Sequence, residues 1–206
     1  MKNTNKRILS SIAMLAAFGA AAWLGATRWL AAALALGMSA ELLAAVKKSK
    51  KKVPFLIGAA GAAYGAALLA SAYFLGAKPA IMLLLLMTIA AADIGAWYFG
   101  RTFGGDKLWP RISPNKTWTG QIAGIICGTA ASVMYSLLAA DIFMSALMWI
   151  GIGVSLLSQY GDLAMSAVKR RLGIKDFSNI LPGHGGLLDR FDGWIFALPT
   201  AWLATL

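Results

Sequence analysis

Long apolar segments separated by short polar stretches dominate this sequence and leave it few possible folds. The hydrocarbon core of a bilayer is about 30 Å thick, so a helix that crosses it needs about 20 mainly apolar residues. We therefore predict an all-α fold, a polytopic membrane helix bundle with about seven transmembrane helices. The expected spans lie near residues 8–26, 29–46, 54–75, 79–99, 119–139, 143–165 and 190–206. The last segment is short and begins with charged residues, so six spans and a re-entrant end are the alternative.

Composition supports a membrane protein and argues against several other classes. Hydrophobic residues make up 59% of the chain and charged residues only 13%, with a mean hydropathy of +0.69. The net charge of +11 is typical of cytosolic basic loops beside anionic lipid, and no nucleic-acid partner is expected. Cys127 is the only cysteine, which excludes an intrachain disulfide and argues against a cysteine metal cluster.

The distribution of basic residues predicts the orientation. With a cytosolic N-terminus, seventeen of the 19 lysines and arginines fall on the cytosolic side, and only Arg28 and Lys78 fall on the other. The positive-inside rule favours this arrangement, so both long polar loops face the cytoplasm. The lysine run over residues 47–52 is expected to stop transfer and to contact the lipid surface.

Small residues recur at spacings that let helices approach closely. Packing inside the chain is the expected role of these glycines, although the same pattern could form a homodimer interface. The sequence does not separate the two. The glycines are Gly61, Gly65, Gly120, Gly124 and Gly128.

Acidic residues are rare and clustered, because five of the eight lie at the ends of two spans or in the loops that follow. One of them, Asp162, shares a helix face with polar residues at offsets of four and seven. The serines on this face suit a hydrogen-bonded helix seam equally well, but the aspartate favours a cation or substrate role. The five acids are Asp93, Asp162, Asp176, Asp189 and Asp192, and the face adds Ser155, Ser158, Ser166 and Lys169.

The acids predict a magnesium site. Mg²⁺ takes oxygen ligands, usually one or two carboxylates together with water and phosphate oxygens. We expect Asp162 and Asp189 to form that pair, with a second cation near Asp192 or Asp93. Capping of the last helix would explain one of Asp189 and Asp192, and less easily both.

Two polar loops, residues 98–118 and 166–192, combine glycines with basic side chains and predict a phosphate cradle on one face. The glycine-rich stretch over 182–186 can adopt positive φ angles and approach a ligand through its amides. We expect its His184, the only histidine, to contact substrate. The basic residues of the loops are Arg101, Lys107, Arg111, Lys116, Lys169, Arg170, Arg171 and Lys175.

These motifs resemble the phosphatidate cytidylyltransferase family over residues 90–193. The C-terminal signature S-x-x-K-R-x4-K-D-x4-x-P-G-H-G-G-x-x-D-R-x-D is filled by Ser166, Lys169, Arg170, Lys175, Asp176, Pro182, Gly183, His184, Gly185, Gly186, Asp189, Arg190 and Asp192. Two further blocks are carried by Asp93, Gly95, Gly100, Arg101, Ser113, Pro114, Lys116, Thr117 and Trp118, and by Ser158, Gln159, Gly161 and Asp162. Thr119 and Met165 depart from a usual Glu, and Gly193 from a common Ser.

The resemblance implies Mg²⁺-dependent transfer of a cytidylyl group from CTP to phosphatidate, which gives CDP-diacylglycerol and pyrophosphate. Residues 1–90 would be N-terminal transmembrane helices, and 91–206 a catalytic membrane region with two cytosolic phosphate-binding loops. The expected location is the bacterial inner membrane, with the active site facing the cytoplasm. The alternatives are a transferase acting on an isoprenoid lipid, or a transporter with Asp93 and Asp162 in its ion path.

The resemblance also implies roles for individual residues. Catalytic roles fall to Asp162, Asp189, Lys169, Arg170, Lys175, His184 and Arg190. Substrate binding falls to Asp93, Arg101, Ser113, Lys116, Ser158, Ser166, Asp176, Gly183, Gly185 and Gly186. Metal binding falls to Asp162, Asp189 and Asp192.

Overall fold

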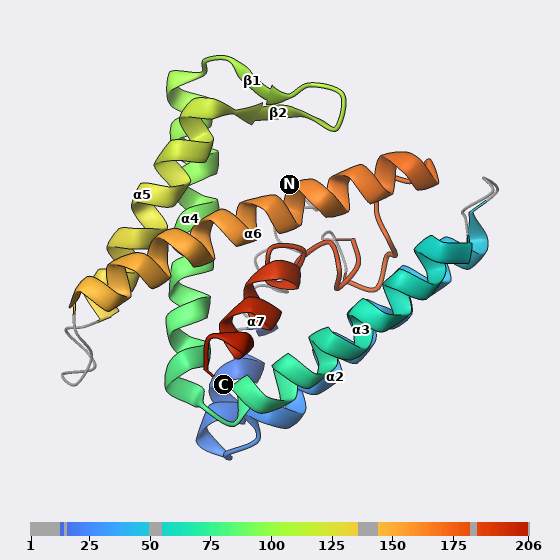
Figure 1. Ribbon diagram of the computed structural model, residues 1–206, viewed down its shortest axis with the longest axis horizontal. Coiled ribbons are helices and arrows are strands. Elements are labelled where there is room, and N and C mark those ends of the chain that lie inside the picture. Colours follow the sequence, from blue (N-terminus) through green and yellow to red (C-terminus); the bar gives the residue numbers. More distant parts are fainter. Residues whose placement is uncertain (1–12, 15, 50–54, 136–143, 182–184, 206) are drawn as a thin grey trace. The chain divides into compact units, whose positions relative to one another are not determined.

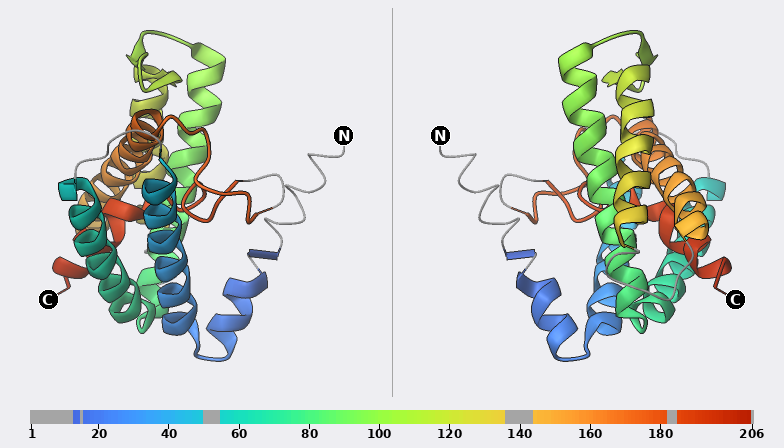
Figure 2. Two further views of the ribbon diagram at one scale, coloured as in Figure 1. Left: turned by 90° about the vertical axis from the view of Figure 1, so that its right-hand side faces the viewer. Right: turned by 90° about the vertical axis from the view of Figure 1, so that its left-hand side faces the viewer.

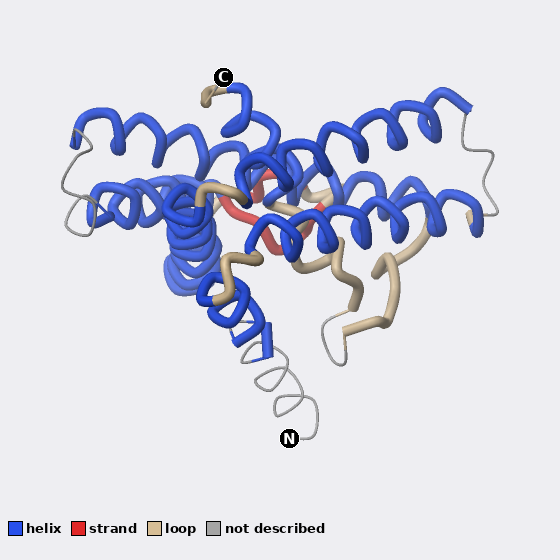
Figure 3. Tube along the Cα trace, turned by 90° about the horizontal axis from the view of Figure 1, so that it is seen from below, coloured by secondary structure: helices blue, strands red, loops and turns tan. Residues whose placement is uncertain are grey.

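The fold is helical, as predicted, with one small β-hairpin (Figures 1 and 3). The computed structural model describes residues 13–14, 16–49, 55–135, 144–181 and 185–205. The chain forms two compact units, which are described separately. The first unit contains Met1–Pro79, Val168–Asp192 and Leu198–Leu206, and the second contains Ala80–Ala167 and Gly193–Ala197.

The first unit is built on a helical hairpin of α2 (Thr27–Lys48) and α3 (Phe55–Gly76), which pack along each other (Figures 1 and 2). The Thr27 hydroxyl donates to the Gly76 carbonyl oxygen at 2.6 Å and so ties the start of α2 to the end of α3. A Cβ at Gly65 would lie 2.9 Å from Ser39 Oγ. Gly65 therefore allows close helix packing, as its spacing predicts.

The second unit pairs α4 (Pro79–Phe103, from Ala80 onward) with α5 (Trp118–Met134), which lie side by side in Figures 1 and 2. A Cβ on Gly120, Gly124 or Gly128 would lie 2.7, 2.8 or 3.0 Å from a backbone carbonyl oxygen of α4. The predicted packing role of these three glycines is therefore confirmed within the chain. The carbonyls belong to Ala96, Ala92 and Thr88, one turn apart along α4.

Helix α6 (Met144–Leu172) completes the second unit with its residues up to Ala167. The Ser132 hydroxyl of α5 donates to the Leu147 carbonyl oxygen at 2.7 Å. Near the other end, the Gln159 side-chain amide donates to the Gln121 carbonyl oxygen at 3.2 Å. These bonds fix α6 against α5 at two levels.

Part of the region expected to be a loop forms an antiparallel β-hairpin of β1 (Lys107–Trp109) and β2 (Ser113–Thr117). Helix α4 also continues to Phe103, which places Arg101 in its last turn. Gly104 and Gly105 follow with φ angles of 64° and 106°, which side chains rarely adopt, so they allow the sharp exit from α4.

The last helix, α7 (Trp194–Leu203), has 10 residues and is shorter than the expected span. At about 1.5 Å per residue it is about 15 Å long, roughly half of a hydrocarbon core. Asp189 and Asp192 lie in the turns before α7, so neither is in its first turn. Within the described residues, two helices, α2 and α4, are long and apolar enough to cross a membrane.

Large apolar side chains are exposed on both units. Trp23 is 91% exposed in the first unit, and Trp97 and Ile126 are each 63% exposed in the second. Such surface is costly in water but suits lipid acyl chains. Together with α2 and α4, this surface indicates a membrane protein.

Candidate active site

A cavity of about 690 Å³ lies in the second unit, between the end of α4, the hairpin, the start of α5 and the middle of α6. It brings together side chains that are far apart in the sequence. The charged residues that line it are Asp93, Arg101, Lys107, Lys116 and Asp162. Four of these were predicted as site residues, and Lys107 was predicted as a loop cation.

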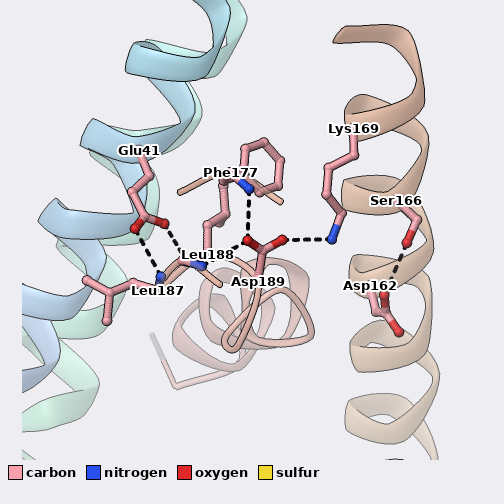
Figure 4. A network of polar contacts seen from close by, with 9 residues as sticks. Glu41, Asp162, Ser166, Lys169, Phe177, Leu187, Leu188 and Asp189 are labelled. Carbon is pink, nitrogen blue, oxygen red and sulfur yellow. Dashed lines mark hydrogen bonds and ion pairs between the residues drawn. The ribbon is translucent and has the colours of Figure 1, made fainter. Parts of the chain in front are cut away.

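The centre of this cavity is an ion pair between Lys116 and Asp162, with Nζ and Oδ2 2.7 Å apart. The two side chains remain 25% and 36% exposed. Lys116 Nζ also lies 3.4 Å from the Gln159 carbonyl oxygen, and the Ser166 hydroxyl lies 3.4 Å from Asp162 Oδ1. The Ser166 contact, visible in Figure 4, confirms that the two residues share a face of α6.

Local structure explains why Lys116 faces this cavity. It lies in β2, one residue before Thr117, whose side chain caps α5 by accepting from the Gly120 amide at 3.1 Å. The hairpin register pairs Thr117 with Lys107, and Lys107 also lines the cavity. The first turn of a helix carries partial positive charge, so the start of α5 adds to the positive charge of the two lysines. This end of the cavity suits phosphate oxygens.

A second polar cluster lies in the first unit and is centred on Asp189 (Figure 4). Its Oδ1 accepts from Lys169 Nζ at 2.8 Å, and its Oδ2 accepts from the amides of Phe177 and Gly186 at 2.8 and 3.0 Å. The Asp189 side chain is 6% exposed and the Lys169 side chain 14%. This carboxylate therefore ties Phe177 to Gly186.

Glu41 of α2, which is 6% exposed, was not predicted as a site residue. Its carboxylate accepts from the Ser178 hydroxyl at 2.6 Å and from the amides of Leu187 and Leu188 at 3.0 and 2.8 Å. The signal was available, because an acid inside an apolar span is costly unless it has partners. Glu41 was passed over because it stands alone in its helix, far in sequence from the signature.

The surroundings of the other predicted residues differ from one residue to the next. Ser158 is fully buried, has no hydrogen-bond partner among the described residues and does not line the cavity, and Ser113 is half-buried in β2. Gly185 has a φ of 85°, as its glycine-rich context predicts. His184 and Gly183 lie outside the described residues. Exposed side chains are those of Arg170, Lys175, Asp176 and Arg190, and Asp192 is half-buried.

The cavity has donors that fit a hard divalent cation. Asp93 and Asp162 contribute two carboxylates, and the amides of Asn115, Gln121 and Gln159 contribute further oxygens. Among the described residues, no three His, Cys, Asp or Glu side chains form a closed metal cage. Carboxylate and amide oxygens are donors that suit Mg²⁺, which also keeps water and takes phosphate oxygens from substrate.

Comparison with known proteins decides the family. A family model described as "Cytidylyltransferase family" matches residues 12–206. The chain belongs to this family. The match includes residues of both units and every predicted site residue.

Curated relatives carry a more specific name. Proteins named phosphatidate cytidylyltransferase from Staphylococcus saprophyticus subsp. saprophyticus and Staphylococcus aureus are each 45% identical to this chain, over 119 and 122 residues. One from Mycobacterium leprae is 43% identical over 122 residues. Each match covers 57% of this chain, but only 46% of the staphylococcal proteins and 38% of the mycobacterial one. The chain thus matches less than half the length of these relatives.

Proposed function

We propose that this member of the cytidylyltransferase family transfers a cytidylyl group from CTP to phosphatidate, forming CDP-diacylglycerol and pyrophosphate. The observation that carries the proposal is the cavity of the second unit, where three cationic and two acidic side chains meet. The names of the curated relatives support the same reaction. The apolar surface of both units supports a lipid substrate.

In this reaction a phosphate oxygen of the lipid attacks the α-phosphorus of CTP, and the bond from that phosphorus to the oxygen that bridges to the β-phosphorus breaks. Pyrophosphate leaves with the bonding electrons. Both reactants are anions, so the enzyme must chiefly position them and neutralise their charge. Arg101, Lys107 and Lys116 are suited to hold the triphosphate.

Asp162 organises this end of the cavity in two ways. Through its 2.7 Å contact it fixes the Lys116 ammonium where phosphate oxygens can reach it. With Asp93 it would also hold Mg²⁺, which supplies charge neutralisation of the triphosphate when bound. Asp189 and Asp192, which belong to the first unit, stay predicted metal ligands.

We further propose that the chain is an inner-membrane protein with a cytosolic N-terminus and about seven membrane segments. Charge supports this orientation, since most Lys and Arg residues fall on the side assigned to the cytoplasm. CTP would then reach the cavity from the cytoplasm. A homodimer also stays a prediction, and it gains no support from Gly120, Gly124 and Gly128, which pack inside the chain.

The test is incubation of purified protein with labelled CTP, Mg²⁺ and either phosphatidate or an isoprenoid phosphate. We expect labelled CDP-diacylglycerol and pyrophosphate with phosphatidate. Asp162→Asn should reduce turnover by roughly 100-fold or more, since a preorganised charge is lost. Asp106→Asn is the matched control, because Asp106 is exposed in the same unit and does not line the cavity.

Three results would count against these assignments. If a CDP-lipid forms only from the isoprenoid phosphate, the substrate is an isoprenoid lipid and not phosphatidate. If neither lipid gives a product, the proposed activity is wrong. Normal turnover by Asp162→Asn would remove Asp162 from the active site.

A further inference from the structure

Glu41 is a buried carboxylate for which the proposed reaction has no direct use. It lies on α2, an apolar helix in which it is the only acidic residue, and it is 6% exposed. A buried charge is tolerated only when hydrogen bonds replace the water that it loses. The partners of Glu41 therefore indicate its role.

All three hydrogen-bond donors to Glu41 come from one segment that is more than 130 positions away in sequence. Oε1 accepts from Ser178 Oγ at 2.6 Å and from the Leu187 amide at 3.0 Å, and Oε2 accepts from the Leu188 amide at 2.8 Å. Figure 4 shows this carboxylate pointing from α2 toward the backbone of Leu187 and Leu188. One side chain thus binds both ends of the segment 178–188.

The fit is close at position 186, where any larger residue would force Glu41 or Ser178 to move. A Cβ there would lie 2.5 Å from Glu41 Oε2, 2.9 Å from Oε1 and 2.9 Å from Ser178 Oγ. Real Cβ atoms do not approach oxygen at 2.5 Å. The second of the paired glycines in the signature is therefore matched to Glu41.

Asp189 holds the same segment from a second direction, through the amides of Phe177 and Gly186. Three consecutive amides, those of Gly186, Leu187 and Leu188, are thus bonded to two carboxylates. Buried amides that lose such partners cost free energy, so the backbone here has one favoured conformation.

We infer that Glu41 is a positioning residue, which fixes the chain at Ser178 and at Leu187–Leu188 and thereby the signature residue Asp189 that follows. It does not touch the reacting atoms and acts through Leu187, Leu188 and Ser178. Its catalytic consequence rests on the proposed cytidylyl transfer, in which residues of this segment take part. Its structural consequence does not depend on that function.

Three substitutions separate these roles. Glu41→Gln keeps one acceptor oxygen but places an amide donor opposite the donors of the segment. Glu41→Asp keeps both oxygens on a shorter side chain. Ser39→Ala is the control. Ser39 lies on the same helix, and its hydroxyl donates to the Ala35 carbonyl oxygen of that helix at 2.8 Å. The control thus removes a polar group from α2 without touching the segment.

The first measurement is backbone hydrogen exchange on the purified protein without substrate. We expect Glu41→Gln to accelerate exchange at Leu187 and Leu188, while exchange in α4 and α5 is unchanged. The second is steady-state kinetics with CTP and phosphatidate. Misplacement of catalytic groups should lower kcat by about 10- to 100-fold with a smaller change in KM for CTP, and Glu41→Asp should recover part of the loss.

The outcomes distinguish the inference from its rivals. Exchange that rises throughout the first unit, with unchanged kcat per folded molecule, would make Glu41 merely structural and overturn the inference. Unchanged exchange at Leu187 and Leu188 would also overturn it. If the wild-type protein makes no CDP-lipid, the proposed function fails, whereas the exchange comparison still decides whether Glu41 holds the segment.

Discussion

At the scale of single residues, the ion pair between Lys169 and Asp189 joins the end of α6 to the turn before α7. Lys169 Nζ and Asp189 Oδ1 are 2.8 Å apart. Removing one partner of a buried pair leaves an uncompensated charge. We expect Lys169→Met to destabilise the protein by about 3 kcal/mol, because among the described residues Asp189 would keep two backbone donors and no cation. Thermal unfolding in detergent measures this loss.

Arg171→Met is the control for the Lys169 prediction. Arg171 is exposed two positions further along α6 and carries the same charge, so it contributes to orientation in the membrane. An exposed charge of this kind contributes little to stability. Equal shifts in melting temperature for the two variants would show that the ion pair stabilises the protein no more than an exposed charge does.

The residues also show what sequence reasoning reaches and what it misses. Asp93, Arg101, Lys116 and Asp162 were predicted from their chemistry, and all four line one cavity. Glu41 was missed because its partners include the backbone amides of Leu187 and Leu188. A sequence does not show which backbone amides will meet a side chain. A contact that depends on the path of the backbone needs coordinates to be seen.

At the scale of elements, the glycine face of α5 makes close helix contacts in the second unit. A Cβ on Gly124 would lie 2.8 Å from both the Ala92 carbonyl oxygen and Gln159 Nε2. Gly124→Ala should therefore push α5 away from α4 and α6, at a cost of about 1–3 kcal/mol. It should also lower activity, since the Gln159 carbonyl oxygen contacts Lys116 in the cavity.

A matched glycine in α6 makes this prediction specific. Nothing lies within 4 Å of a Cβ built at Gly153. Because alanine favours helix over glycine by up to about 1 kcal/mol, Gly153→Ala should leave the melting temperature unchanged or raise it. A stable, fully active Gly124→Ala protein would contradict the packing described for α4 and α5.

Elements differ in how far their sequence determines them. The apolar runs near 29–46, 54–75 and 79–99 predict α2, α3 and α4 to within a few residues, since length and hydrophobicity are enough for a helix in lipid. The hairpin was not predicted, because Lys107–Trp109 has only 3 residues and the 5-residue strand Ser113–Thr117 is polar and contains Pro114. Its strands are held by their pairing with each other, which no periodicity in the sequence reports.

At the scale of the whole molecule, the orientation in the membrane can be tested at the two ends of α4. This helix has 25 residues, so it is about 37 Å long and exceeds a hydrocarbon core of about 30 Å. Lys78 precedes it and Asp106 lies just beyond its end, and both are exposed. If α4 spans the bilayer, these two positions face opposite compartments.

Because the protein has a single native cysteine, replacing it removes all background labelling by a thiol reagent. In a Cys127→Ala background, Lys78→Cys and Asp106→Cys can each be tested with a membrane-impermeant maleimide on right-side-out and inside-out vesicles. The excess of Lys and Arg on the hairpin side predicts that Asp106→Cys reacts only in inside-out vesicles and Lys78→Cys only in right-side-out vesicles. The opposite result would place the charged cavity outside the cell, away from cytosolic CTP. Labelling of both positions from one side would mean that α4 does not cross the bilayer.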